Sequence, residues 1–291
     1  MPQSVALQTG NALGPRASAY VASLLKQVVR TVHSDATDSE CTSDLFDLCI
    51  TVGNTNLARQ MVGIPLGIDS LGPEAFGVGV NGSGGLVLSA YGNPYMNSSS
   101  SNTPVNGALY GAFAVLEILG YGFLHPLQPL IPSVLDVERA ESSDWFASKP
   151  THRLRMWHYH TEHPLELTDV LQGFNASTQI NVMSAAPRTA DGHAVPSPPY
   201  FESWDSMLPQ LNSFFAWLVA NRQNHFEWVM LLDGAWESYG TSDERKARFS
   251  TMVRMAHDWG LFVGADAPLV MVQQHAWHMA DGGAAVEIQE Q

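Results

Sequence analysis

Cysteine, positive charge and long apolar runs are all scarce in this chain, and each scarcity excludes a class of protein. Its two cysteines, Cys41 and Cys49, are too few for a disulfide framework or a cysteine-rich zinc site. They leave two alternatives open, one bridge or a pair of free buried thiols. The 14 Lys and Arg residues stand against 28 Asp and Glu, and the formal net charge of -14 would repel nucleic acid and anionic membrane surfaces.

No segment of the sequence has the pattern of a signal peptide or of a membrane span. Residues 1–7 contain neither a basic nor an apolar region, so a cytoplasmic location is expected unless the natural start lies upstream, in which case secretion stays open. The most apolar run, residues 108–119, includes Glu117 and falls short of the roughly 20 residues that a span needs. We therefore predict a globular protein without a membrane partner, and the oligomeric state stays open.

The first half of the chain, residues 1–145, predicts an α/β domain built on a mixed sheet with helices. A helix is expected where apolar residues recur at helical spacing, and strands where short β-rich runs end at Gly or Asn. In order, the predicted elements are a strand at 5–8, a helix at 16–32, a polar loop at 34–43, a strand at 45–52, a hairpin of strands at 75–80 and 86–91, a buried helix at 107–120 and a linker at 136–149.

The hairpin contains a pattern that resembles a nucleotide-binding fingerprint. Residues Gly77 to Gly82 satisfy G-x-G-x-x-G. That fingerprint works because a helix N-terminus follows the glycines and receives the pyrophosphate, and here a strand is predicted to follow. We therefore interpret the glycines as turn residues and predict no cofactor.

The second half, residues 150–291, predicts strands that alternate with helices, which is typical of a parallel sheet. The predicted elements are strands at 153–159, 226–232 and 261–265 and helices at 201–221 and 245–259. A (β/α)8 barrel takes about 250 residues, so this half is expected to hold only the first part of one. The predicted fold class is therefore α/β, with a support domain followed by an incomplete TIM barrel.

One stretch of the first half resembles a known module. The run Gly107-Ala-Leu-Tyr-Gly-Ala-Phe113 continues to Leu-Glu-x-Leu-Gly120 and is followed by an aromatic residue and His125-Pro126. Residues 5–132 resemble the α/β domain that precedes the catalytic barrel in family 20 hexosaminidases and family 67 α-glucuronidases. The resemblance implies a domain that supports the barrel and is not itself catalytic.

The second half resembles the same glycosidases more distantly. Asn221 to Asn224 before a strand, and Asp233 after it, are similar to the second strand of the hexosaminidases, although Trp228 stands where a His is expected. Residues 263–268 resemble their third strand, but Leu269 and Val270 replace the usual Gly-His. The resemblance implies a divergent relative whose catalytic carboxylates lie beyond Gln291.

Polar residues cluster where each predicted strand ends, and the carboxyl ends of barrel strands carry function. Carboxylates, imidazoles, amides and an indole suit a sugar, which offers hydroxyl groups and a C–H face. The candidate substrate-binding residues are His158, His160, Glu162, His163, Asp233, Trp236, Asp266, Gln273 and His275. For single residues a plainer role stays open, such as a core histidine at His158, a cap at Asp266 or packing at Trp236.

These residues predict a glycosidase that hydrolyses, or at least binds, a carbohydrate, with no catalytic residue assigned. Glycoside hydrolysis uses two carboxyl groups at a defined separation, and we do not identify both in this sequence. The alternative is a non-catalytic carbohydrate-binding or structural protein.

A metal site formed by His158, His160 and His163, with Glu162, is a competing hypothesis. On a strand His158 and His160 share one face, as two ligands would. The helical H-E-x-x-H motif is absent, however, and Pro164 cannot continue a helix. We therefore predict no metal.

Overall fold

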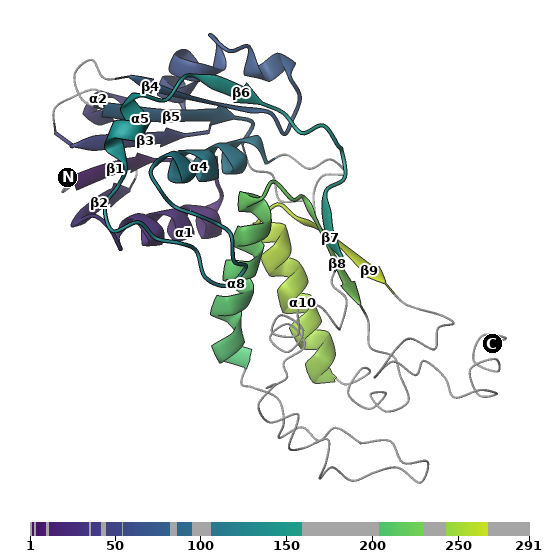
Figure 1. Ribbon diagram of the computed structural model, residues 1–291. Helices are drawn as coiled ribbons and strands as arrows, with labels where there is room; N and C mark the ends of the chain where they lie inside the picture. The colour runs from purple at the N-terminus through teal and green to yellow at the C-terminus, as the bar shows by residue number, and fades with distance from the viewer. Residues whose placement is uncertain are drawn as a thin grey trace, which may run out of the picture. The chain divides into compact units, whose positions relative to one another are not determined.

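The computed structural model describes residues 2, 4–9, 12–34, 36–41, 45–53, 55–81, 86–94, 106–158, 204–229 and 243–266. The predicted α/β class is confirmed, because helices accompany a six-stranded mixed sheet (Figure 1). The chain forms two compact units. The first unit comprises Met1–Met156, Ser213–His225 and Ala256–Phe262, and the second comprises Trp157–Asn212, Phe226–Met255 and Val263–Gln291.

The large sheet belongs to the first unit. Its strands are β1 (Ser4–Gln8), β2 (Thr31–Ser34), β3 (Leu48–Val52), β4 (Phe76–Asn81), β5 (Leu86–Gly92) and β6 (Phe146–Ser148), in the order β2-β1-β3-β5-β4-β6. β1 runs parallel to β2 and β3, and β3 runs parallel to β5, whereas β4 is antiparallel to both β5 and β6. The predicted hairpin is therefore confirmed as the β4–β5 pair.

Short and long helical segments lie between these strands. They are α1 (Pro15–Leu25), α2 (Asp38–Cys41), α3 (Asn56–Ala58), the π-helical turn η1 (Arg59–Gly63), the 3-10 turn η2 (Ile68–Ser70), α4 (Gly107–Ile118) and α5 (Val137–Glu141). The predicted buried helix is confirmed as α4, in which every residue except Glu117 is buried. Within the described part of the chain, no helix is long and apolar enough to span a membrane.

One face of the large sheet is apolar and packs against α4. The register places Ile50 beside Leu88 and Val52 beside Ala90, so these buried side chains point to the same face. α4 approaches this face closely, because a Cβ on Gly111 would lie 2.9 Å from the Cβ of Ala90. A glycine at that position lets the helix and the sheet meet without a gap.

The opposite face carries polar side chains as well as the apolar Val87 and Tyr91, and α3, η1 and η2 pack against it. Thr51 and Ser89 are neighbours on it and share a buried hydrogen bond of 2.8 Å. Gly77 leaves room for η1, since a Cβ there would lie 2.8 Å from side-chain atoms of Ile68 and Val62. Gly77 and Gly79 therefore lie inside β4 and serve packing, so their interpretation as turn residues was wrong.

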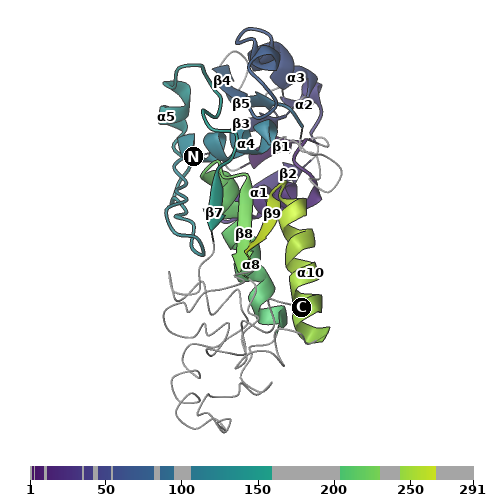
Figure 2. The same cartoon turned by 90° about the vertical axis from the view of Figure 1, so that its right-hand side faces the viewer.

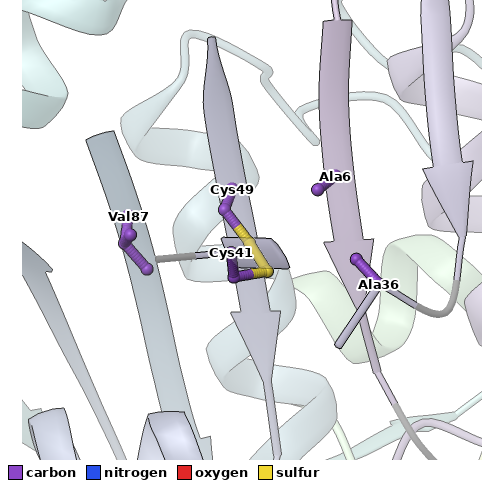
Figure 3. Packing of buried hydrophobic residues seen from close by; sticks show 5 residues of the cluster. All are labelled: Ala6, Ala36, Cys41, Cys49 and Val87. Carbon is purple, nitrogen blue, oxygen red and sulfur yellow. A yellow bond between two sulfur atoms is a disulfide. The ribbon is translucent and has the colours of Figure 1, made fainter. Parts of the chain in front are cut away.

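Cys41 and Cys49 form a disulfide, which decides between the two alternatives left open by the sequence (Figure 3). The bridge joins α2 to the buried strand β3, and the Cα atoms are 5.4 Å apart. Ala6, Ala36 and Val87 surround it in one hydrophobic cluster.

Three predictions about the first half were wrong. The helix predicted to continue to residue 32 ends at Leu25, and residues Thr31–Ser34 form β2, because pairing with β1 outweighs local helical spacing. The predicted polar loop contains α2, and the predicted linker contains α5 and β6. β6 is a sheet strand, since Phe146 pairs with Val78 of β4.

The second half contains the elements that the sequence predicts, with shifted ends. They are β7 (Met156–His158), α8 (Trp204–Ala220), β8 (His225–Val229), α10 (Asp243–Asp258) and β9 (Phe262–Asp266). The three strands form a separate sheet in the order β7-β8-β9, and β8 and β9 point the same way (Figures 1 and 2). Gly260 follows the end of α10 and has a φ of 70°, the left-handed conformation that its predicted role as a helix stop requires.

Candidate functional site

Two of the nine predicted site residues lie at strand ends in the structure. His158 is the last residue of β7 and Asp266 is the last residue of β9. β8 lies between these strands, and neighbouring strands are about 4.8 Å apart, so the strands that carry the two residues are on the order of 10 Å apart. The other seven predicted residues, His160, Glu162, His163, Asp233, Trp236, Gln273 and His275, lie outside the described residues.

At the other end of these strands, where β7 and β8 begin, the first unit contains a buried polar cluster. We call it the Arg155 cluster, and it consists of Glu74, Tyr110, Arg155 and Asn224. Glu74 precedes β4, and Tyr110 lies in the first turn of α4. Arg155 and Asn224 are the residues directly before β7 and β8. The fold thus gathers four polar side chains from distant parts of the sequence at the start of two strands.

The guanidinium of Arg155 and the carboxylate of Glu74 form the centre of this cluster. Nη2 of Arg155 lies 2.7 Å from Oε1 of Glu74, and Nη1 donates to Oε2 at 3.3 Å. Both side chains are largely withdrawn from solvent, with exposed fractions of 14% for Arg155 and 9% for Glu74. This two-pronged geometry is the strong form of an Arg–carboxylate pair.

The neighbours of this ion pair use its remaining hydrogen-bonding capacity. The hydroxyl of Tyr110 donates to Oε1 of Glu74 at 2.9 Å and accepts from Nη2 of Arg155 at 2.9 Å. Nδ2 of Asn224 contacts both Glu74 oxygens at 3.3 Å, while its Oδ1 accepts from the backbone N–H of Arg155 at 2.9 Å. A buried charge pair with partners of this kind has its desolvation offset by good geometry.

Backbone hydrogen bonds tie the same cluster to the chain around it. Nε of Arg155 donates to the carbonyl of Arg222 at 2.5 Å, and Nη1 donates to the carbonyl of His152 at 2.7 Å. Nδ2 of Asn224 donates to the carbonyl of Arg153 at 2.8 Å. The cluster therefore fixes the course of the chain as it enters β7 and β8.

The pKa shifts in the cluster keep Tyr110 and Arg155 in their protonated forms. Burial raises the pKa of the Tyr110 hydroxyl, and the negative charge of Glu74 raises it further, so Tyr110 stays protonated and acts as a donor. Burial alone would lower the pKa of Arg155, but its hydrogen bonds to Glu74 and its interaction with Tyr110 outweigh that effect, and the pKa is raised. A permanently charged Arg and a permanently neutral Tyr move no proton, so we assign the cluster a positioning role.

Sequence reasoning missed the Arg155 cluster. Asn224 belongs to the segment before the second predicted strand, but Glu74 and Tyr110 carry no signal of their own, because their partners are far away in the sequence. The available signal was Arg155 itself, a charged residue between the apolar residues Leu154 and Met156 of the predicted strand. Such a residue is expected to have a buried partner.

The metal hypothesis stays untested, because His160, Glu162 and His163 lie outside the described residues and only the backbone of His158 is described. Among the residues that the structure does describe, no group of three or more His, Cys, Asp or Glu side chains is arranged to hold a metal ion.

A crevice of about 270 Å³ opens beside the Arg155 cluster. It is lined by residues 71–75 and by Lys149, Pro150, His152 and Arg153. Lys149, His152 and Arg153 are exposed there, whereas Glu74 is already engaged by Arg155. The crevice is small and open, and the basic side chains around it are exposed to solvent. We therefore assign it no ligand.

No protein-family model matches this chain, and no curated protein matches it either. The similarity to the two glycosidase families therefore depends on the motif residues alone.

Proposed function

We propose that this chain binds a carbohydrate at the carboxyl ends of β7, β8 and β9, and that these strands are the first three of a glycosidase-type (β/α)8 barrel. The observation that carries the proposal is the order β7-β8-β9 with α8 and α10 between the strands. In a barrel of this kind consecutive strands are neighbours, and each is followed by a helix.

The residue types at the strand ends support a sugar as the ligand. His158 and Asp266 end the two outer strands, and the sequence directly after β7 supplies His160, Glu162 and His163. Imidazole and carboxylate groups bond sugar hydroxyls, and in α/β folds with parallel strands ligands bind at the carboxyl ends of the strands. The position of the Arg155 cluster at the opposite end fits the same architecture, in which that end serves stability.

The second candidate function is carbohydrate binding without catalysis. It stays a candidate because the sequence itself assigns no carboxylate pair, whereas hydrolysis typically needs two carboxyl groups roughly 5–9.5 Å apart. Turnover discriminates the two functions, because a binding protein retains the sugar but does not cleave it.

Binding is tested by calorimetric titration of the chain with methyl glycosides of glucuronic acid and N-acetylglucosamine. Asp266→Asn and His158→Ala are each expected to weaken binding by about tenfold, the loss of one hydrogen bond to a charged or polar group. Asp144→Asn and His152→Ala make the same chemical changes at exposed positions of the first unit and are the matched controls. Equal affinities for Asp266→Asn, His158→Ala and the two controls would count against the site.

Catalysis is tested separately with aryl glycosides of the same two sugars and the full-length gene product. Release of the aryl alcohol supports the glycosidase, whereas binding without release supports the second candidate. The absence of both binding and turnover with every sugar tested would refute the proposed function in either form.

A further inference from the structure

A second crevice lies in the first unit, far in the sequence from β7, β8 and β9. Its volume is about 630 Å³, within the range of small-molecule sites. Its polar lining consists of Gln8, Thr37, Asp38, Ser39, Thr55 and Asn56. We call it the switch-point crevice, because it lies where the strand order reverses at β1.

The crevice lies at the carboxyl ends of three parallel strands. Gln8 is the last residue of β1, residues 37–39 follow β2, and Thr55 and Asn56 follow β3. The chain leaves β1 through α1 to reach β2 on one side, and then passes to β3 on the other side of β1. In open α/β sheets such a reversal of strand order creates a crevice outside the strand ends, and ligands bind there.

The lining of the crevice favours a neutral ligand with many hydroxyl groups. It offers three hydroxyl side chains and two amides, which both donate and accept hydrogen bonds. Among the described residues that line it there is no Lys or Arg, and Asp38 adds a negative charge, so a phosphate or another anion would be poorly held.

Gln8 has an unused acceptor at this place. Its Nε2 donates to Oδ1 of Asp38 at 2.7 Å, and because a carboxylate only accepts, this contact fixes which end of the amide is the oxygen. The oxygen, Oε1, is buried and has no hydrogen-bond partner among the described residues. A buried acceptor without a donor is costly. Because Gln8 lines the crevice, a ligand hydroxyl that displaces the atoms covering Oε1 would remove that cost.

Other contacts hold the crevice lining in place before any ligand arrives. Thr55 accepts from the backbone N–H of Ala58 through its side chain at 3.2 Å and so caps α3. Thr37 and Glu40 bond each other reciprocally, which is the capping box of α2. The disulfide then attaches α2 to β3. A preorganised lining loses little entropy on binding.

We propose that the switch-point crevice is a second binding site, and that it takes a neutral mono- or disaccharide with Gln8 Oε1 as an acceptor for a sugar hydroxyl. This site is independent of the one proposed at β7, β8 and β9. It gives the α/β unit a binding function of its own.

The test uses D-glucose, D-xylose and maltose as probes and saturation-transfer NMR on the whole chain, with backbone amide shifts to locate the ligand. The key variant is Gln8→Leu, and Gln27→Leu makes the same change at an exposed residue after α1. We expect Gln8→Leu to raise the Kd by about fivefold to tenfold through the lost hydrogen bond, and Gln27→Leu to leave it unchanged. Asn56→Ala, at an exposed residue, should raise the Kd by about twofold.

Each outcome bears on the proposal. Amide shifts that concentrate at residues 37–39 and 55–56 and weaken in Gln8→Leu support it. If Gln8→Leu fails to fold, the Asn56→Ala titration and the shift map of the unaltered chain decide. The proposal is overturned if none of the three sugars binds the folded chain, if inorganic phosphate displaces them, or if Gln8→Leu binds as well as Gln27→Leu.

The two proposed sites are separated by their variants. His158→Ala and Asp266→Asn should leave the shifts around residues 37–39 unchanged, and Gln8→Leu should leave binding at β7, β8 and β9 unchanged. Failure at one site therefore leaves the other proposal standing on its own measurement.

Discussion

The first unit contains two polar regions, the Arg155 cluster and the switch-point crevice, and they differ in how their polar groups are paired. In the Arg155 cluster the guanidinium, the carboxylate, the phenol and the amide bond one another. In the crevice the buried oxygen of Gln8 has no partner among the described residues, and side chains with hydroxyl or amide groups line an open volume. The paired groups of the Arg155 cluster serve stability, whereas the open crevice is the region for which we propose recognition of a ligand.

The two regions also lie at different ends of strands, the Arg155 cluster at amino ends and the switch-point crevice at carboxyl ends. The Arg155 cluster and the contact between Asn106 and Gly260, in which Nδ2 donates to the carbonyl at 2.9 Å, lie before β7, β8 and β9 begin. The crevice lies after β1, β2 and β3 end. In parallel sheets the carboxyl ends are the side at which loops converge on a ligand. Substitutions in the two regions should therefore change different measurable quantities.

Breaking the ion pair should give the largest effect on stability. Glu74→Ala leaves the Arg155 guanidinium largely buried without its counter-charge, which costs about 3–5 kcal/mol of unfolding free energy. Urea unfolding followed by circular dichroism measures the change. Sugar binding at the switch-point crevice should persist in this variant under conditions where it is folded.

The control for this prediction is the exposed pair of Arg16 and Asp258, which lie 3.1 Å apart with exposed fractions of 38% and 42%. Because water screens that pair, Arg16→Met should cost only about 0–1 kcal/mol. The double variant Glu74→Leu with Arg155→Met should be more stable than Glu74→Ala, since it leaves no unpaired buried charge. Equal losses for Glu74→Ala and Arg16→Met would remove the distinction between a buried and an exposed pair.

Removing the disulfide is expected to have the second-largest effect on stability. The bridge holds α2, which carries the crevice residue Asp38. The bridge closes a segment with a sequence separation of 8, and replacing both Cys41 and Cys49 by Ala should lower stability by about 2–3 kcal/mol. Alanine is chosen because both positions are buried. The loss should appear as a lower thermal midpoint, and a reductant should lower the midpoint of the unaltered chain but not that of the double variant.

The same double variant sharpens the comparison between the two regions. α2 carries Asp38 and one end of the bridge, so we expect weaker sugar binding at the crevice when the bridge is absent. The Arg155 cluster has no residue on α2, and the cost of Glu74→Ala should be the same with and without the bridge. A bridge-dependent cost of Glu74→Ala would show that the two regions are coupled.

Local sequence patterns were sufficient to predict the elements whose own residues favour their structure. The run of apolar residues in α4, the β-rich runs of the β4–β5 hairpin and the succession from β7 to β9 all follow from neighbouring residues. β2 and β6 could not be predicted in this way. Each has only three or four residues, and each becomes a strand through pairing with a distant one, β1 or β4.

The same limit applies to the sites. Strand ends can be located from the sequence, so His158 and Asp266 were placed at the ends of β7 and β9 in advance. The Arg155 cluster depends on side chains separated by 36 to 150 positions, and no local pattern connects them. The switch-point crevice depends on the strand order, which becomes visible only when β2 is recognised as a strand.

Removing the Tyr110 hydroxyl should give a smaller loss than removing a charge. Tyr110→Phe keeps the buried ring but deprives Glu74 of a donor and Arg155 of an acceptor, and a loss of about 1–2 kcal/mol is expected. Because the unaltered hydroxyl stays protonated, this loss should be constant from neutral to mildly alkaline pH. Tyr121→Phe is the matched control in α4's neighbourhood, where the hydroxyl donates to the single carbonyl of Leu24 at 3.0 Å. A loss in Tyr110→Phe no greater than that in Tyr121→Phe would contradict a special role for the cluster.

The smallest expected effect concerns the capping box beside the switch-point crevice. The backbone N–H of Thr37 donates to Oε2 of Glu40 at 2.7 Å, and this bond, followed by the one from the Thr37 hydroxyl, lowers the pKa of Glu40 below its ordinary value of 4.5. A carboxyl group whose pKa is depressed by folding stabilises the fold above its unfolded pKa, and that stabilisation disappears as the pH falls through the folded pKa. The amide proton of Thr37, followed by NMR, should therefore titrate with a midpoint below 4.5, and Glu40→Gln should abolish that step. A midpoint at or above the ordinary value would mean that the bond does not hold α2 in solution, and the crevice lining would then not be preorganised on that side.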